Sequence, residues 1–166
     1  MKQTDGWIEK LGLIAHPEGG YYREVYRSAD LLKASCLPAP FEGERSVSTA
    51  IYYLLEQNDF SAFHRINSDE IWHHYAGGIL TIYSIEPGLG ELSIQYLGVD
   101  DDKSTPMLVI PHGHWFAAQP AQNCDFVLVG CTVAPGFDFA DFQLAERKTL
   151  TNQFPQHADL INALTR

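Results

Sequence analysis

Short runs of β-forming residues, separated by turns rich in glycine and proline, follow one another along most of this 166-residue chain. The runs have the length of single strands. We expect strands at 21–28, 48–55, 62–66, 70–76, 79–85, 92–97, 107–110, 115–118 and 126–133. Many short strands at regular spacing in a chain of this size predict one all-β domain, either a sandwich or a barrel.

Helical patterns are confined to the two ends of the chain. Trp7, Ile8 and Leu11 share one helical face near the start, and residues 157–164 carry a similar apolar face near the end. Domains cluster around ~100–150 residues, so the length suits one domain. We therefore expect a single domain over residues 1–166, with a short helix at each end.

The charge balance limits the partners that such a protein can take. There are 21 acidic and 11 basic side chains, which gives a net charge of −10 with neutral histidines. This surplus disfavours nucleic acid and anionic membrane surfaces. No apolar run approaches the ~20 residues of a membrane span, and the N-terminus lacks the apolar core of a secretory signal. With no CxxC motif, the 3 cysteines favour the reducing cytoplasm.

Histidines gather in two places and give the chain its candidate chemistry. His64 and His74 lie on either side of Glu70, and His114 belongs to a second cluster. Histidine beside carboxylate is a pairing that serves proton transfer or metal binding. Residues of equal parity share one face of a strand, so Trp72 and His74 lie on the same face as Glu70.

Two segments resemble the conserved motifs of the cupin superfamily. These are HRINSDEIW at 64–72 and VIPHGHW at 109–115. Two more, HPEGGYYREVYRS at 16–28 and GCTVAPGFDFADF at 130–142, resemble a small, uncharacterised, sugar-epimerase-like cupin family. The resemblance implies a cupin double-stranded β-helix, a jelly-roll barrel that holds a small molecule. Within HPEGGYYREVYRS, Glu18 and Arg23 could line the mouth of the barrel.

The cupin metal pattern, three histidines and one glutamate, is incomplete in this chain. His64 and Glu70 match it, but Ile66 and Phe116 stand at the other two positions. A stable transition-metal site needs three or four protein ligands. We therefore expect no metal cofactor. If a metal is bound, the expected ligands are His64, Glu70, His74 and His114.

The resemblance to metal-free cupin epimerases implies an epimerase or isomerase of a sugar-like carbonyl compound. In those relatives a histidine at the position of His64 removes a proton next to a ketone, and a tyrosine on the other side returns one. The expected catalytic residues are His64, Glu70, which would orient the imidazole with Asp138 as the alternative, and Tyr53 as the acid with Tyr75 as the alternative. The expected substrate-binding residues are Arg23, Arg65, Trp72, His74, Trp115 and Asp138.

Two other functions are consistent with the sequence. One is a metal-dependent cupin enzyme, either a dioxygenase or an isomerase. The other is a non-catalytic protein that binds or senses a small molecule. Small barrels commonly pair through edge strands, so we expect a homodimer.

Overall fold

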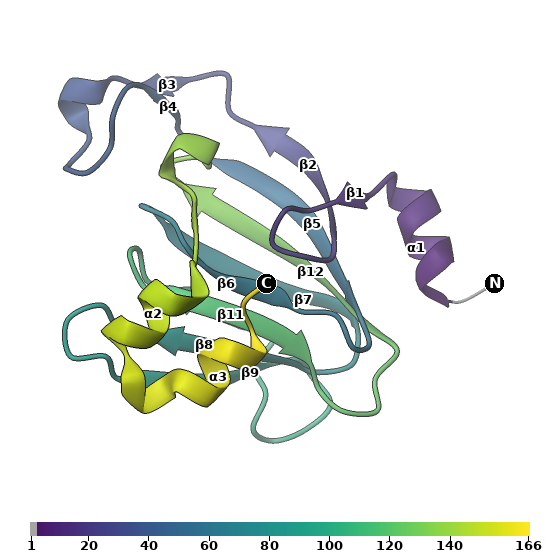
Figure 1. Cartoon of the computed structure of the whole chain (residues 1–166). Coiled ribbons are helices and arrows are strands. Elements are labelled where there is room, and N and C mark those ends of the chain that lie inside the picture. Colours follow the sequence, from purple (N-terminus) through teal and green to yellow (C-terminus); the bar gives the residue numbers. More distant parts are fainter. Residues whose placement is uncertain (1–2) are drawn as a thin grey trace.

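The computed structural model describes residues 3–166 and consists of two facing antiparallel sheets with helices at the ends of the chain (Figure 1). One sheet has the order β1 (Ile14–Ala15), β2 (Tyr21–Arg27), β5 (Thr49–Glu56), β12 (Phe126–Ala134), β7 (Asp69–Gly77) and β10 (Met107–Ile110). The other has the order β13 (Gln143–Leu144), β6 (Ser61–Arg65), β11 (Trp115–Pro120), β8 (Leu80–Ile85) and β9 (Leu92–Leu97). The all-β jelly-roll expectation is confirmed.

The α-helices pack against the outside of this double layer. The α-helices are α1 (Gln3–Leu11), α2 (Arg147–Gln153) and α3 (Ala158–Ala163), and the 3-10 helices are η1 (Ala34–Cys36), η2 (Phe139–Asp141) and η3 (Pro155–His157). A small ribbon of β3 (Leu31–Leu32) and β4 (Arg45–Ser46) projects from the barrel (Figure 1). No helix in the described range 3–166 is long and apolar enough to cross a bilayer.

The main core lies between the sheets and closes one end of the barrel. It contains Leu80 and Ile82 from β8 and Val127 and Val129 from β12, all buried. A second core packs α2 and α3 against the outer face of the five-stranded sheet around Phe63. Tyr53, Trp72 and Cys131 belong to the main core and also line a hollow, so the hollow borders this core.

The expected strands agree with the observed ones to within two residues at each end. Helix α2 was not expected, because its sequence RKTLTNQ has one apolar residue, Leu150, and no helical apolar period. This helix is instead held by Glu146, whose carboxylate accepts the backbone N–H groups of Lys148 and Thr149.

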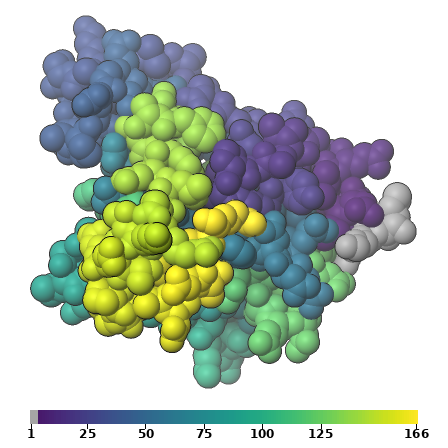
Figure 2. Space-filling model, viewed as in Figure 1, coloured from purple at the N-terminus to yellow at the C-terminus, as the bar shows by residue number. Residues whose placement is uncertain are grey.

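Two loops complete the open end of the barrel. The turn at residues 16–20 lies against β5, where Gly20 has φ +71° and a Cβ atom would come within 2.6 Å of the Leu54 carbonyl oxygen. The segment 135–142 crosses nearby, anchored by Asp141, which accepts from Arg45 at 2.6 and 2.7 Å. Figure 2 shows this yellow-green segment against the purple N-terminal part of the chain.

The expected homodimer stays a prediction, and the feature relevant to it is the pair of edge strands that the two sheets leave open. Edge strands β9 and β10 expose Ile94, Tyr96, Met107 and Val109, each at least 40% exposed. Apolar side chains at open edges are consistent with pairing between copies.

Candidate functional site

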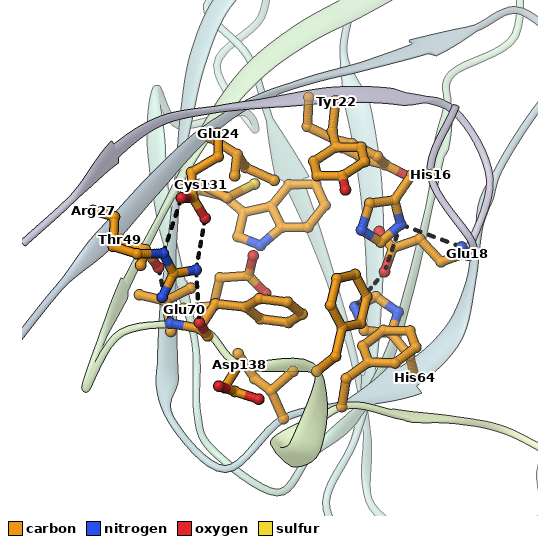
Figure 3. A pocket seen from close by; sticks show the side chains of 18 residues that line it. His16, Glu18, Tyr22, Glu24, Arg27, Thr49, His64, Glu70, Cys131 and Asp138 are labelled. Atoms are coloured by element: carbon orange, nitrogen blue, oxygen red, sulfur yellow. Dashed lines mark hydrogen bonds and ion pairs between the residues drawn. The ribbon is translucent and has the colours of Figure 1, made fainter. Parts of the chain in front are cut away.

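A cavity of about 450 Å³ lies at the open end of the barrel. Its floor is the inner face of β5, β6, β7 and β12, and its mouth is formed by β2, the turn at residues 16–20 and the segment 135–142. Alternation along the strands selects the lining residues, so Glu70 and Trp72 of β7 both face inward. Figure 3 shows the cavity with its polar side chains directed toward it.

A buried ion pair forms one wall of the cavity. The Glu18 carboxylate accepts from His64 Nε2 at 3.0 Å and from Ser61 Oγ at 2.8 Å. Glu18 is 6% exposed and His64 is 3% exposed. Burial raises the pKa of Glu18, but the charge and hydrogen bond of His64 outweigh it and bring the pKa to about 2. Glu18 is therefore an anion at neutral pH.

The hydrogen bonds of His64 fix its protonation state. Its Nδ1 lies 2.7 Å from the Ala62 carbonyl oxygen, and its Nε2 faces the ionised Glu18. Both partners can only accept, so both ring nitrogens donate and the ring is an imidazolium. Burial lowers the pKa of His64, but the Glu18 charge and hydrogen bond raise it above its usual value. His64 thus has no free nitrogen with which to remove a proton from a ligand.

His16 is a second histidine of the cavity, and it is neutral. Its Nδ1 accepts the backbone N–H of Glu18 at 3.2 Å, which places the ring proton on Nε2. Burial lowers the pKa of His16, and this effect outweighs the attraction of Glu18, which lies 3.7 Å away. Figure 3 shows the other ring nitrogen of His16 directed to the cavity. His16 can therefore donate an N–H to a bound ligand.

Glu70 is the titratable group that stands apart from these pairs. It is 8% exposed and, in residues 3–166, takes part in no ion pair. Burial raises its pKa to about 7, the His64 charge opposes this and the Glu18 charge adds to it. The buried indole N–H of Trp72 has no well-aligned hydrogen-bond partner, yet it lies near enough to Glu70 to lower the pKa slightly. A carboxyl group of this kind exchanges its proton near neutral pH.

Tyr53 lines the cavity but is held by the protein. Its hydroxyl donates to the Gly19 carbonyl oxygen at 2.7 Å, and the side chain is 1% exposed. Burial raises the pKa of Tyr53 well above its usual value. The hydroxyl therefore supports the turn at residues 16–20 and has no free proton directed at a ligand.

The mouth of the cavity carries a second ion pair and the carboxylate of Asp138. Arg27 donates to both carboxylate oxygens of Glu24, at 2.7 and 2.9 Å, and to the Phe137 carbonyl oxygen at 3.1 Å. Asp138 is exposed, and its side chain accepts the Ala140 backbone N–H. Figure 3 shows the Glu24–Arg27 pair and the Glu18–His64 pair on opposite sides of the cavity.

The structure divides the residues expected from the sequence into two groups. Five of them line the cavity, namely His64, Glu70, Tyr53, Trp72 and Asp138. The others lie elsewhere, namely Arg23, Arg65, His74, Trp115 and His114. The expectation that Glu18 could line the mouth fits its place in the cavity wall.

Each residue of the second group has a different environment. Arg23 donates to the Leu11 carbonyl oxygen on the outside of β2, and Arg65 lies over the ring of Trp115 at 4.6 Å. His74 Nε2 lies 3.0 Å from the Gly78 carbonyl oxygen, and His114 Nδ1 lies 2.9 Å from Ser84 Oγ. Since strand neighbours alternate in direction, Arg23 and Arg65 point away from the side to which Tyr22 and His64 point.

The residues of the barrel do not fit the metal site that the superfamily resemblance raises. Phe116 pairs with His64 across β11 and β6, and its ring lies 4.1 Å from the imidazole, where a further ligand would be needed. Both nitrogens of His64 are already donors. No group of three or more His, Cys, Asp or Glu residues able to hold a metal ion occurs in the described part of the chain. We therefore derive no step through a metal.

His16 and Arg27 were not expected as site residues from the sequence. Both belong to HPEGGYYREVYRS, the segment that carried the resemblance to the narrower family. The segment reads locally as a turn and a strand, and its placement over the cavity depends on contacts with β5, which begins at Thr49. The density of polar residues in this segment was the one sequence feature that could have indicated these site residues.

The pKa of Glu70 predicts a pH dependence of stability. Between pH 4.5 and about 7 the folded protein keeps a proton that the unfolded chain releases. The free energy of unfolding therefore falls by up to about 3 kcal/mol as pH rises through this window. Glu18 has the opposite effect on the free energy of unfolding. The stability that ionised Glu18 contributes is lost as pH falls from 4.5 toward 2.

Urea denaturation of the wild type and Glu70→Gln from pH 4.5 to 8 measures this contribution. We expect the variant to gain stability relative to the wild type as pH rises. A difference between the two proteins that does not change with pH would contradict the assignment.

Comparison with known proteins shows which families, sequences and structures this chain resembles. The sequence model of a family described as Cupin superfamily (DUF985) matches residues 5–145. The uncharacterized protein YML079W of Saccharomyces cerevisiae is 31% identical over 147 residues, which cover 81% of this chain and 71% of the yeast protein. Protein SO0799 from Shewanella oneidensis has a crystal structure with a TM-score of 0.88 and 39% identity, covering 100% of this chain and 99% of that one.

Further solved structures extend this likeness. A hypothetical protein from Leishmania major gives a TM-score of 0.87 at 29% identity, covering 97% of each chain. Oxalate decarboxylase from Bacillus subtilis gives a TM-score of 0.55 at 14% identity, covering 90% of this chain and 36% of that enzyme. At that identity the likeness is one of fold alone.

Proposed function

This chain belongs to the DUF985 family of the cupin superfamily, and we propose that it binds a small carbonyl compound in its cavity and moves a proton on it without a metal. The reaction class is isomerisation or epimerisation. The observation that carries the proposal is Glu70, a buried cavity carboxyl group with a pKa of about 7. A base for a carbon acid works best when its pKa lies near the working pH.

The proposed reaction begins with ionised Glu70. Its carboxylate takes a proton from the carbon next to the ligand carbonyl, and the electron pair of that C–H bond forms the C=C bond of an enolate. The carbonyl oxygen gains the negative charge, and the N–H of neutral His16 donates to it. For epimerisation, water gives a proton to the other face of that carbon, and Glu70 later releases its proton to water. For isomerisation of an α-hydroxy carbonyl compound, Glu70 gives its proton to the former carbonyl carbon, while the proton of the neighbouring hydroxyl passes to the enolate oxygen and that hydroxyl becomes the new carbonyl.

His64 has a supporting role in this proposal and is not the base expected from the sequence. The imidazolium is fixed by Ala62 and Glu18. Its positive charge lowers the cost of ionising Glu70 in the barrel, as its effect on the pKa of Glu70 indicates. The same charge stabilises the enolate.

Proton exchange in deuterated water tests the function. The protein is incubated with a panel of small keto and aldehyde sugars and related carbonyl compounds, and deuterium at the carbon next to the carbonyl is followed by proton NMR. We expect exchange with the wild type for at least one class. The His16→Phe variant should exchange about tenfold to a hundredfold more slowly, because it lacks the N–H donor.

The thermal stability of His16→Phe is measured alongside its rate, since a folded variant is needed for the comparison. An unchanged rate would remove His16 from the mechanism. Compounds that protect the wild type against unfolding and yet never exchange would instead indicate a non-catalytic binding protein.

A further inference from the structure

Aromatic rings enclose the cavity from several sides. Tyr22 lies edge-on to His16 with ring centroids 4.5 Å apart, and the ring of Phe139 is stacked with that of His16 at 6.5 Å. On the floor, Tyr53 and Trp72 contact one another edge to face at 5.8 Å. These aromatic residues come from β2, β5, β7 and the segment 135–142. A ligand in the cavity therefore has aromatic rings on more than one side.

The charges facing the cavity do not balance. Its lining contains four carboxylates, and His64 and Arg27 as cations. Each cation is already paired, one with Glu18 and the other with Glu24. Two carboxylates form no ion pair in the described chain, Glu70 on the floor and Asp138 at the mouth; the charge of His64 acts on Glu70, and those of Arg27 and Arg45 act on Asp138, only from a longer distance.

Among the described residues that line this cavity, an anionic ligand would find no cation that is free of a carboxylate partner. The Arg27 guanidinium donates to Glu24 and to a carbonyl oxygen. An anionic ligand would have to break the bidentate Arg27–Glu24 ion pair in order to bind it. Arg23 and Arg65, which were expected to bind the substrate, do not line the cavity. Phosphate groups, including those of sugar nucleotides, are therefore poorly matched to the site.

We propose that the cavity binds a small organic cation, whose ammonium group lies among the aromatic rings and is balanced by Glu70 and Asp138. Cations are attracted to the faces of aromatic rings, and this attraction grows when both are removed from water. Trp72, whose buried N–H lacks a well-aligned partner, lies on the same floor and supplies a donor for a polar atom of the ligand. The inference rests on the proposed function because it takes the same cavity as the substrate site. It names the substrate class as a carbonyl compound that carries an ammonium group.

Calorimetric titration with three compounds of nearly the same shape tests this inference. The probes are choline, its uncharged carbon analogue 3,3-dimethylbutan-1-ol, and the anion 3,3-dimethylbutanoate, each at millimolar concentration and pH 8, where Glu70 is ionised. We expect choline to bind at least about tenfold more tightly than the uncharged analogue, and the anion to bind most weakly. Equal or tighter binding of the uncharged compound or the anion would overturn the inference, as would failure of choline to bind.

Two variants locate the binding. Asp138→Asn keeps an acceptor for the Ala140 N–H and removes the charge, so choline affinity should fall about two- to fivefold while that of the uncharged analogue stays the same. Asp102→Asn removes the same charge from an exposed loop outside the cavity and is the matched control. Equal effects of the two variants would place choline outside the cavity and contradict the inference.

These experiments test the binding proposal and the catalytic proposal separately. Choline has no carbonyl group and binds without turnover, so its affinity does not depend on the proton-transfer proposal. Exchange of uncharged carbonyl compounds without choline binding would overturn the cation inference alone. Choline binding without exchange of any carbonyl compound would overturn the proposed function alone.

Discussion

Replacing Glu70 by glutamine should slow the exchange of solvent deuterium into the bound carbonyl compound by about 10²–10⁴-fold. Glutamine has nearly the same shape as glutamate and cannot accept a proton at neutral pH. The Trp72 N–H and the His64 charge remain on the cavity floor in this variant, so the ligand still meets the same walls. We therefore expect the loss in the rate constant of exchange at saturating ligand, with a smaller change in affinity.

The control for this prediction is Glu44→Gln, the same change at an exposed position outside the cavity. Its exchange rate should equal that of the wild type. If Glu70→Gln folds and exchanges within a few-fold of the wild type, another group moves the proton and the mechanism is wrong.

The second large effect concerns the buried pair of Glu18 and His64. Glu18→Ala leaves the His64 Nε2–H without its acceptor, leaves Ser61 Oγ unpaired and opens space in the wall. Breaking a buried ion pair from one side costs about 3–5 kcal/mol. We expect a loss of this size in the free energy of unfolding at pH 7, measured in urea.

Glu18→Gln is the informative comparison. Its amide can donate to Nε2 of a neutral His64 and accept from Ser61, so it should lose less than half as much stability. A thermodynamic cycle of Glu18→Ala with His64→Ala should give a coupling of at least about 1 kcal/mol. Additive single effects, or a loss below about 1 kcal/mol for Glu18→Ala, would show that the pair does not hold the wall.

The strands of this chain could be predicted because each one is a short β-forming run with a clear turn on either side. Phe126–Ala134 is an example, since its apolar residues are buried on both faces between β5 and β7. Two-residue strands such as Gln143–Leu144 carry no such pattern. They form because a neighbour, here β6, supplies the ladder.

The candidate site was predictable where strand alternation decides it. Glu70 and Trp72 lie two residues apart on β7 and both reach the cavity. The same alternation places Arg65 on the face opposite His64, over Trp115, so its expected role in binding had no support from strand geometry.

The chemistry of the site was not predictable from residue type, because it depends on partners that are distant in the chain. His64 is an imidazolium owing to Glu18 in the turn at residues 16–20, which folds over β6 only in the complete barrel. Glu70 becomes the group that titrates near neutrality because burial and the Glu18 charge act on it together. The sequence segments predicted His64 and Glu70 as site residues, and both line the cavity; the contact between Glu18 and His64 is the reason that we propose Glu70 and not His64 as the base.

The titration of Glu70 itself tests its proposed role directly. The side-chain carboxyl carbon, labelled with carbon-13 and assigned by comparison with Glu70→Gln, is followed by NMR from pH 4 to 9. We predict a midpoint of about 7 for this resonance. A midpoint at the ordinary glutamate value of 4.5 or below would show that Glu70 is ionised throughout the neutral range, and would contradict its assignment as the proton-transfer group.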